Sequence, residues 1–163
     1  MTSRQSKGET AAPSSHSSEV ALAQGWCALS VLHDRIHAHI ERALQAKHDL
    51  SVREFSLLNV LSHQQSELGD HLHMKEVAKA VVLSQSATTR LVTRLEDRGY
   101  LCRFLCQEDK RGIYTNVTPE GLELLAAAKP TNQKALTEAL ELARADENLR
   151  GLVEALELSG GAG

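Results

Sequence analysis

The sequence is poor in aromatic residues and in cysteine, and both shortages limit what the protein can be. Aromatic residues make up 3% of the 163 residues, whereas hydrophobic residues as a whole make up 42%. A core must therefore be built mainly from Leu, Ala and Val, a mixture that favours helices. Three cysteines are too few for a disulfide framework, and reduced thiols are typical of the cytoplasm.

Long apolar runs are also lacking. No stretch approaches the roughly 20 apolar residues that cross a bilayer, and the first residues lack the apolar run of a secretory signal. The chain contains no nucleophile elbow, phosphate-binding glycine loop, dinucleotide fingerprint or histidine–glutamate metal motif. We therefore expect a cytoplasmic protein that is not an enzyme, needs no cofactor or metal and has no membrane partner.

Basic residues are scarce overall but gather in the middle of the chain. The formal net charge is -3, which argues weakly against a polyanionic partner. Residues 74–112 nevertheless hold eight Lys or Arg against five acids, whereas from residue 119 onward four bases face eight acids. Because local charge decides which surface meets phosphate, the middle segment is the candidate for binding nucleic acid.

The N-terminal half of the sequence predicts a tail followed by two helices. Residues 1–18 are rich in Ser and Thr and predict a disordered tail. Apolar residues recur at helical spacing over 19–48, which predicts a long helix. Ser51 and Glu54 form a capping box for a second helix, whose inner face carries Phe55, Leu58 and Leu61.

A helix-turn-helix and a hairpin are predicted next. Residues 72–74 fit a short strand and 75–81 a short helix. Ser84 is a good N-cap for a helix over 85–98, which Gly99 ends. Strands are expected at 100–107 and 113–117, with a charged turn between them. Thr118 and Pro119 then start a long helix to about residue 145, and a last helix spans about 147–158, before a tail at 159–163.

The helix over 85–98 carries the predicted function. Leu91 and Leu95 would anchor it in the core with Ala87 and Val92, which leaves hydroxyls and guanidiniums on the other face. Such groups bond phosphates and base edges in a major groove, although an ordinary solvated face has the same composition. The predicted DNA-binding residues are Ser84, Gln85, Ser86, Thr88, Thr89, Arg90, Thr93, Arg94, Lys110 and Arg111. The prediction requires the guanidiniums to face solvent together, not to be locked into carboxylate pairs.

Several fragments together resemble one family. They are Val77-Ala78-Lys79, Ser84 to Val92, Leu95 to Leu101, Asp109-Lys110-Arg111-Gly112 and Val117 to Gly121. Their order and spacing are similar to those of the MarR (multiple-antibiotic-resistance regulator) family over about residues 25–145. The resemblance implies a mainly α fold with a small β-hairpin, namely a winged helix-turn-helix DNA-binding domain with long N- and C-terminal dimerisation helices.

The resemblance also implies roles and partners. The helix from Ser84 to Arg94 would read the major groove of double-stranded DNA, Arg111 would reach the minor groove, and Asp109 would support the wing. A homodimer would form through helices at 19–48 and 119–158, flanking a DNA-binding domain at 49–118, and would bind a palindromic operator. We expect a transcriptional regulator, a repressor by preference, that is associated with the bacterial nucleoid when DNA-bound and is modulated by a small-molecule effector.

Other residues are candidates for sensing an effector, an oxidant or a metal. Trp26, Cys27 and His33 are candidates for an effector pocket or sensor: Cys27 would make the regulator redox-responsive, and the i, i+4 pair His33 and His37 would make it metal-responsive. Cys102 and Cys106 lie too far apart along a strand for a disulfide, so packing is the expected role of both. Two further hypotheses are a winged-helix module that binds protein and not DNA, and a hydrolase in which Cys27, His33 and His37 converge on a metal.

Overall fold

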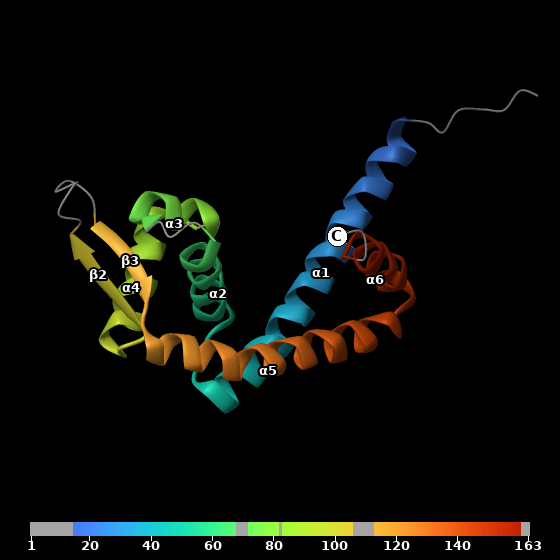
Figure 1. Ribbon diagram of the computed structural model, residues 1–163. Helices are drawn as coiled ribbons and strands as arrows, with labels where there is room; N and C mark the ends of the chain where they lie inside the picture. Colours follow the sequence, from blue (N-terminus) through green and yellow to red (C-terminus); the bar gives the residue numbers. More distant parts are fainter. Residues whose placement is uncertain (1–14, 68–71, 82, 106–112, 161–163) are drawn as a thin grey trace, which may run out of the picture. The chain divides into compact units, whose positions relative to one another are not determined.

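A computed structural model describes residues 15–67, 72–81, 83–105 and 113–160 (Figure 1). The elements are α1 (Ser15–His48), α2 (Val52–Glu67), β1 (Leu72–His73), α3 (Met74–Ala80), α4 (Gln85–Asp97), β2 (Leu101–Leu105), β3 (Ile113–Val117), α5 (Pro119–Arg144) and α6 (Glu147–Gly160). The predicted mainly helical fold with a small hairpin is confirmed. Residues 15–18 and 159–160, assigned above to the tails, are instead helical.

The chain forms two compact units. The terminal unit combines the described residues up to Asp34 with those from Ala143 onward, and the winged-helix unit is Arg35–Leu142. The predicted segment boundaries at residues 48 and 118 differ from this division. The difference arises because the later part of α1 and most of α5 contribute Ile40, Leu44 and Leu125 to the core of the winged-helix unit.

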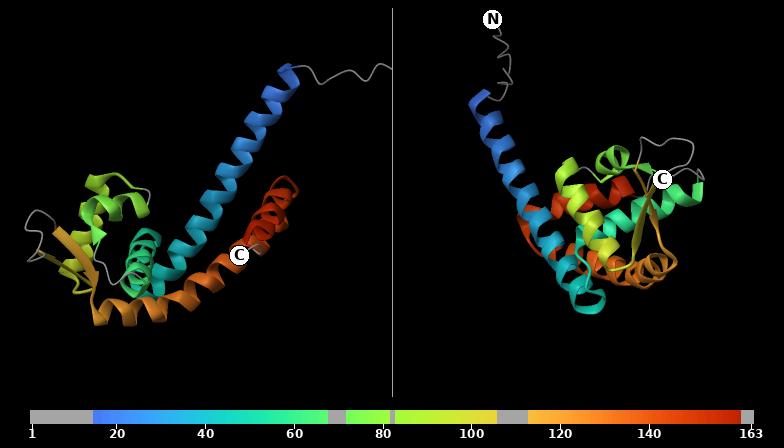
Figure 2. Two further views of the ribbon diagram at one scale, coloured as in Figure 1. Left: turned by 45° about the horizontal axis from the view of Figure 1, so that its top comes forward. Right: turned by 90° about the vertical axis from the view of Figure 1, so that its left-hand side faces the viewer.

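A three-stranded antiparallel sheet lies at one side of the winged-helix unit, with strand order β1-β3-β2. In the β2–β3 hairpin Leu101 pairs with Val117 and Phe104 with Tyr114. Helices α3 and α4 pack against each other (Figures 1 and 2) and are joined by a short turn, which gives the helix-turn-helix predicted from the sequence.

The core of the winged-helix unit is aliphatic, as the composition predicts. The inner face of α2 supplies Phe55, Leu58 and Leu61, all buried as expected, together with Leu57. Leu91, Val92 and Leu95 of α4 and the hairpin residues Leu101 and Val117 pack into the same cluster. Burial of these side chains fixes which face of α4 remains exposed.

The Ser51–Glu54 capping box is present in both directions. The Ser51 hydroxyl accepts the Glu54 N–H at 3.1 Å, and the Glu54 carboxylate accepts the Ser51 N–H at 2.9 Å. Just before it, Asp49 takes a left-handed conformation with φ 51° where α1 ends. The junction between α1 and α2 is therefore held by local bonds that the sequence pattern predicts.

The end of α4 and the start of α5 meet at a tightly packed corner. Gly99 has φ 79° and ends α4 with two bonds, from the Gly99 N–H to the Glu96 carbonyl and from the Tyr100 N–H to the Leu95 carbonyl. These bonds make a Schellman cap, for which glycine is the usual residue. Thr118 caps α5, because its hydroxyl accepts the Gly121 N–H at 3.1 Å and donates to the Gly99 carbonyl at 2.7 Å.

The terminal unit has a small core and a large apolar surface. Leu32 of α1 and Leu149 and Val153 of α6 are buried, whereas Leu22, Trp26 and Leu29 of α1 are exposed. A groove of about 780 Å³ is lined by Val20, Ala23, Gln24, Gly25, Cys27, Ala28, Val31, Asp146, Asn148 and Leu149. None of the helices in the described ranges is both long and apolar enough to span a membrane.

Candidate nucleic-acid interface

Helix α4 begins at an N-cap with extended backbone. Ser84 has φ −65° and ψ 152°, and its hydroxyl accepts the Ala87 N–H at 3.3 Å. The buried face of the helix is then made by Thr88, Leu91, Val92 and Leu95, with Ala87 only half-buried beside them. This face differs from the predicted one by one residue, because Thr88 takes the place predicted for Ala87.

The prediction that Thr88 contacts DNA is wrong. Its side chain is fully buried, and its hydroxyl donates to the Ser84 carbonyl at 3.0 Å. This bond satisfies the hydroxyl within the helix, so that threonine packs there at little cost. Thr88 therefore supports α4 from inside and leaves the candidate contact set.

The other predicted residues of α4 remain accessible. Thr93 is half-buried. The exposed ones are Ser84, Gln85, Ser86, Thr89, Arg90 and Arg94. A single helix face thus offers hydroxyls, an amide and two guanidiniums, the donors and acceptors that bond phosphates and base edges.

Arg90 and Arg94 lie one helical turn apart but differ in their partners. Arg90 is exposed and has no carboxylate partner among the described residues. Arg94 makes an ion pair with Glu54, with Nη2 and Oε1 separated by 3.3 Å, while its side chain is 63% exposed. Both guanidiniums are exposed, but Arg94 is paired with a carboxylate, contrary to the prediction. Arg111, the third guanidinium of the prediction, lies outside the described residues.

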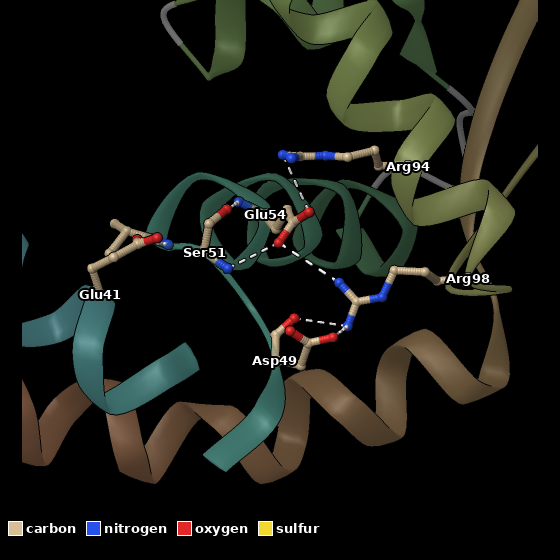
Figure 3. Close-up of polar contacts among 7 residues, drawn as sticks. Glu41, Asp49, Ser51, Glu54, Arg94 and Arg98 are labelled. Atoms are coloured by element: carbon tan, nitrogen blue, oxygen red, sulfur yellow. Dashed lines mark hydrogen bonds and ion pairs between the residues drawn. The ribbon is translucent and has the colours of Figure 1, made fainter. Parts of the chain in front are cut away.

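Glu54 belongs to a polar cluster, the Glu54 cluster, that the sequence did not predict. Its members are Asp49, Ser51, Glu54, Arg94 and Arg98 (Figure 3). Arg98 donates to the Asp49 carbonyl at 2.7 Å and lies 3.3 Å from the Asp49 carboxylate and 3.7 Å from that of Glu54. The cluster therefore ties the last turn of α4 to the junction between α1 and α2. The capping box indicated Glu54 as a cap, but no local spacing indicated its arginine partners.

A second ion pair joins α4 to the wing. The Glu96 carboxylate accepts bonds from Arg103 Nε at 2.7 Å and from the Arg103 N–H at 3.2 Å, and it also contacts Arg103 Nη2. The side-chain bond from Arg103 lowers the pKa of Glu96, against an opposing effect of burial. Glu96 thus stays ionised at neutral pH and fixes β2 against the end of α4.

The described part of the wing is built on an aromatic pair. Phe104 and Tyr114 stack across the hairpin with ring centroids 5.9 Å apart. Cys102 is exposed, so its predicted packing role is wrong: its side chain lies on the strand face opposite the buried Leu101. Cys106 and the wing-tip residues Asp109, Lys110 and Arg111 lie outside the described residues.

The groove of the terminal unit is lined by one of the three candidate sensor residues. Cys27 is exposed and lines the groove of the terminal unit, whereas Trp26 and His33 are not among the lining residues. His33 lies 3.1 Å from the Asp34 carboxylate at the surface. No three His, Cys, Asp or Glu side chains in the described ranges are grouped to hold a metal ion. The convergence of Cys27, His33 and His37 that the hydrolase hypothesis needs is therefore not present.

Two other histidines have structural partners. His39 Nε2 lies 3.2 Å from the Glu138 carboxylate, and His48 Nε2 lies 2.8 Å from the Thr131 hydroxyl. Both bonds connect α1 to α5 within the winged-helix unit. The hydrogen bond from His39 lowers the pKa of Glu138.

The segment that contains the helix-turn-helix and β2 is similar to one protein family. Residues 48–112 match the family model of the MarR family. This segment of the chain is similar to the MarR family. The match ends within the wing, so it contains α2, α3, α4 and the arginines described above.

Known MarR-family proteins resemble the chain in sequence and structure. The transcriptional regulator Hpr of Bacillus mycoides is 31% identical over 99 residues, which cover 58% of this chain and 51% of Hpr. PecS of Dickeya dadantii is 30% identical over 56% of this chain and 55% of its own length. The chain thus spans about half the length of these curated relatives.

Solved structures share the fold over more of the chain. One is Sco3205, a MarR family transcriptional regulator from Streptomyces coelicolor that was solved in complex with DNA. It is 25% identical to this chain with a TM-score of 0.67, and the match covers 90% of each chain. CouR from Rhodococcus jostii RHA1, solved bound to p-coumaroyl-CoA, is 29% identical with a TM-score of 0.58, over 66% of this chain and 71% of CouR.

Proposed function

We propose that the protein is a homodimeric transcriptional regulator, a repressor, that binds a palindromic DNA operator through α4 and the wing. The observation that carries the proposal is the division of α4 into a buried aliphatic face and an exposed face with Arg90 and Arg94. The DNA complex of Sco3205 supports it, since that protein shares the fold and a quarter of its residues. Lys110 and Arg111 are proposed to follow the backbone and minor groove.

The test is DNA recovery followed by a salt titration. Genomic fragments that copurify with the protein are sequenced, and anisotropy is measured on a recovered duplex and on a scrambled duplex of equal composition. We expect an inverted repeat with half-sites about one helical turn, roughly 34 Å, apart. Each neutralised phosphate adds about −0.9 to the slope of log K against log salt, so six contacts weaken binding roughly a thousandfold between about 50 and 200 mM. Absence of salt-dependent binding to either duplex would instead support the protein-interaction module.

The dimer is proposed to form through the terminal unit. Its helix α1 exposes a stripe at i, i+4 and i+7, namely Leu22, Trp26 and Leu29, and α6 exposes Leu156 and Leu158. Contiguous apolar surface of this kind is unusual on a monomer and is typical of an interface. The occupant proposed for the stripe is a second copy of the chain.

Replacing Leu29 with glutamate is expected to weaken the dimer, because a carboxylate would be buried without a partner at the interface. We expect the dimer dissociation constant to rise about tenfold, equivalent to about 1.4 kcal/mol, as measured by sedimentation. Gln45→Glu adds the same charge at an exposed position of α1 in the winged-helix unit and serves as the control. An unchanged dissociation constant for Leu29→Glu would place the interface elsewhere.

A small-molecule effector is the last part of the proposal. The support is the CouR structure with p-coumaroyl-CoA, a ligand named for that protein alone. Trp26, Cys27 and His33 remain the proposed effector-side residues. Cys27 has the strongest support of the three, because it lines the groove of the terminal unit.

A further inference from the structure

Glu54 is a buried acid that contacts Arg94 on the exposed face of α4, the face proposed to bind DNA. The Glu54 side chain is 5% exposed, yet its Oε1 atom lies 3.3 Å from a guanidinium that the proposed function assigns to DNA. Most surface ion pairs contribute little to stability. Loss of the cation partner costs a buried carboxylate far more free energy than it costs an exposed one. Glu54 and a DNA phosphate are thus two anions that can bind the same arginine (Figure 3).

Glu54 keeps other partners if Arg94 leaves it. Its Oε2 atom accepts the Ser51 N–H at 2.9 Å and lies 3.7 Å from Arg98, whose side chain is only 28% exposed. Arg98 is itself anchored, because it donates to the Asp49 carbonyl at 2.7 Å. Departure of Arg94 therefore leaves no unpaired buried charge, which is the condition for exchange at moderate cost.

We propose that Glu54 is an internal competitor for Arg94 and lowers the affinity of the protein for DNA. In the free protein the buried carboxylate holds the guanidinium, and DNA must displace it. Arg90, one turn earlier, has no such carboxylate among the described residues and is available from the start. The inference rests on the proposed function, because it presupposes that α4 meets DNA.

The two kinds of duplex respond differently to loss of the competitor. On scrambled DNA, we expect a phosphate contact alone not to displace Glu54, so that Arg94 adds nothing to the salt dependence. On the operator, Arg94 is expected to leave Glu54 and contact a phosphate in the wild type too, so this contact already contributes to the wild-type salt dependence. Removing the competitor therefore adds a phosphate contact on scrambled DNA but only removes a cost on the operator.

The experiment compares Glu54→Gln with Glu41→Gln by anisotropy on both duplexes. Glutamine preserves the shape of Glu54 and can still accept the Ser51 N–H. Glu41 is a matched control, since its carboxylate also caps α2, accepting the Val52 N–H at 2.7 Å, but does not pair with Arg94. Both variants remove one negative charge from the same junction.

We expect Glu54→Gln to bind scrambled DNA about threefold more tightly than wild type, roughly the contribution of one added phosphate contact. A gain of similar size is expected on the operator, where the cost of displacing Glu54 is removed. On scrambled DNA the slope of log K against log salt steepens by about 0.9, and on the operator it is unchanged. Glu41→Gln shows a smaller gain and no change of slope. In an Arg94→Gln background, Glu54→Gln has no effect, because the coupling passes through Arg94.

Other outcomes separate the inference from the proposed function. Equal behaviour of the two glutamine variants, or weaker operator binding by Glu54→Gln, would overturn the competition and leave the regulator proposal standing. Failure of the wild type to bind either duplex would overturn the proposed function itself. If Glu54→Gln does not fold, Glu54→Asp retains the charge but shortens its reach, and a smaller gain in affinity is expected; no gain would overturn the inference.

Discussion

Replacing Gly121 with alanine is expected to lower the free energy of unfolding by about 3 kcal/mol, the upper end of the usual cost of overpacking. A Cβ atom at this position would lie 2.2 Å from the Tyr100 carbonyl oxygen and 2.8 Å from Val117 Cγ1. Both distances are far below van der Waals contact. Thermal unfolding should show a fall in Tm of roughly 10 °C for a chain of this length.

The neighbouring backbone has little freedom to relieve this clash. The Tyr100 carbonyl accepts the Thr118 N–H at 3.1 Å, and the adjacent Gly99 carbonyl accepts the Thr118 hydroxyl at 2.7 Å. Displacing Tyr100 would therefore disturb the end of α4 and the cap of α5 together. Helix α4, which is proposed to bind DNA, is positioned by this corner, so the variant should also lose operator affinity.

Gly151→Ala is the matched control for Gly121→Ala. Gly151 lies in α6, is exposed, and has no atom within 4 Å of an added Cβ. Alanine in an open helical position should raise stability by about 0.5–1 kcal/mol. If Gly121→Ala and Gly151→Ala unfold at the same temperature, the first turn of α5 does not approach Tyr100 as closely as described.

The fold was largely predictable because its signals are local. Ser51 with Glu54, Ser84, Gly99 and Thr118 mark helix ends through bonds that span only a few residues. Such bonds depend on side-chain type and spacing, which a sequence displays directly. The order of helices and strands follows from these ends and from the apolar periodicity between them.

The candidate site was predicted less completely because part of it depends on tertiary contacts. Threonine is a polar residue that is usually exposed, but the position of Thr88 in the helix places it beside Leu91 and Leu95 in the core. Arg94 and Glu54 are 40 positions apart, so only the packing of α2 against α4 brings them together. The close approach of Gly121 to Tyr100 likewise joins segments whose spacing carries no signal.

Two carboxylates, Glu96 and Glu54, hold α4 in place through ion pairs. Glu96 connects the helix to β2 through Arg103, and Glu54 connects it to the α1–α2 junction through Arg94 and Arg98. The lowered pKa of Glu96 means that its contribution to stability is present above the ordinary carboxyl pKa and is lost as pH falls through the lowered value. The orientation of α4 therefore does not change with pH near neutrality through this pair.

Replacing Arg90 with alanine is expected to cause the largest loss of operator binding among the residues of α4. Arg90 is exposed and has no described carboxylate partner, so no internal bond has to be broken when it meets DNA. A bidentate arginine–base contact contributes about 1–3 kcal/mol to discrimination, which corresponds to a roughly 5- to 150-fold weaker operator complex. On scrambled DNA only a phosphate-type contact is lost, and the affinity should fall about threefold.

Two further variants separate the effect of the Arg90 charge from that of its contact with a base. Arg90→Lys keeps the charge but loses the planar fork, so it should restore binding to scrambled DNA and leave the operator complex weakened. Arg42→Ala removes an equal charge from an exposed position of α1 and should leave operator preference unchanged. An Arg90→Ala protein that loses the same factor on both duplexes would show that Arg90 contacts only phosphate, and base reading would then have to be sought at Gln85 or Arg94.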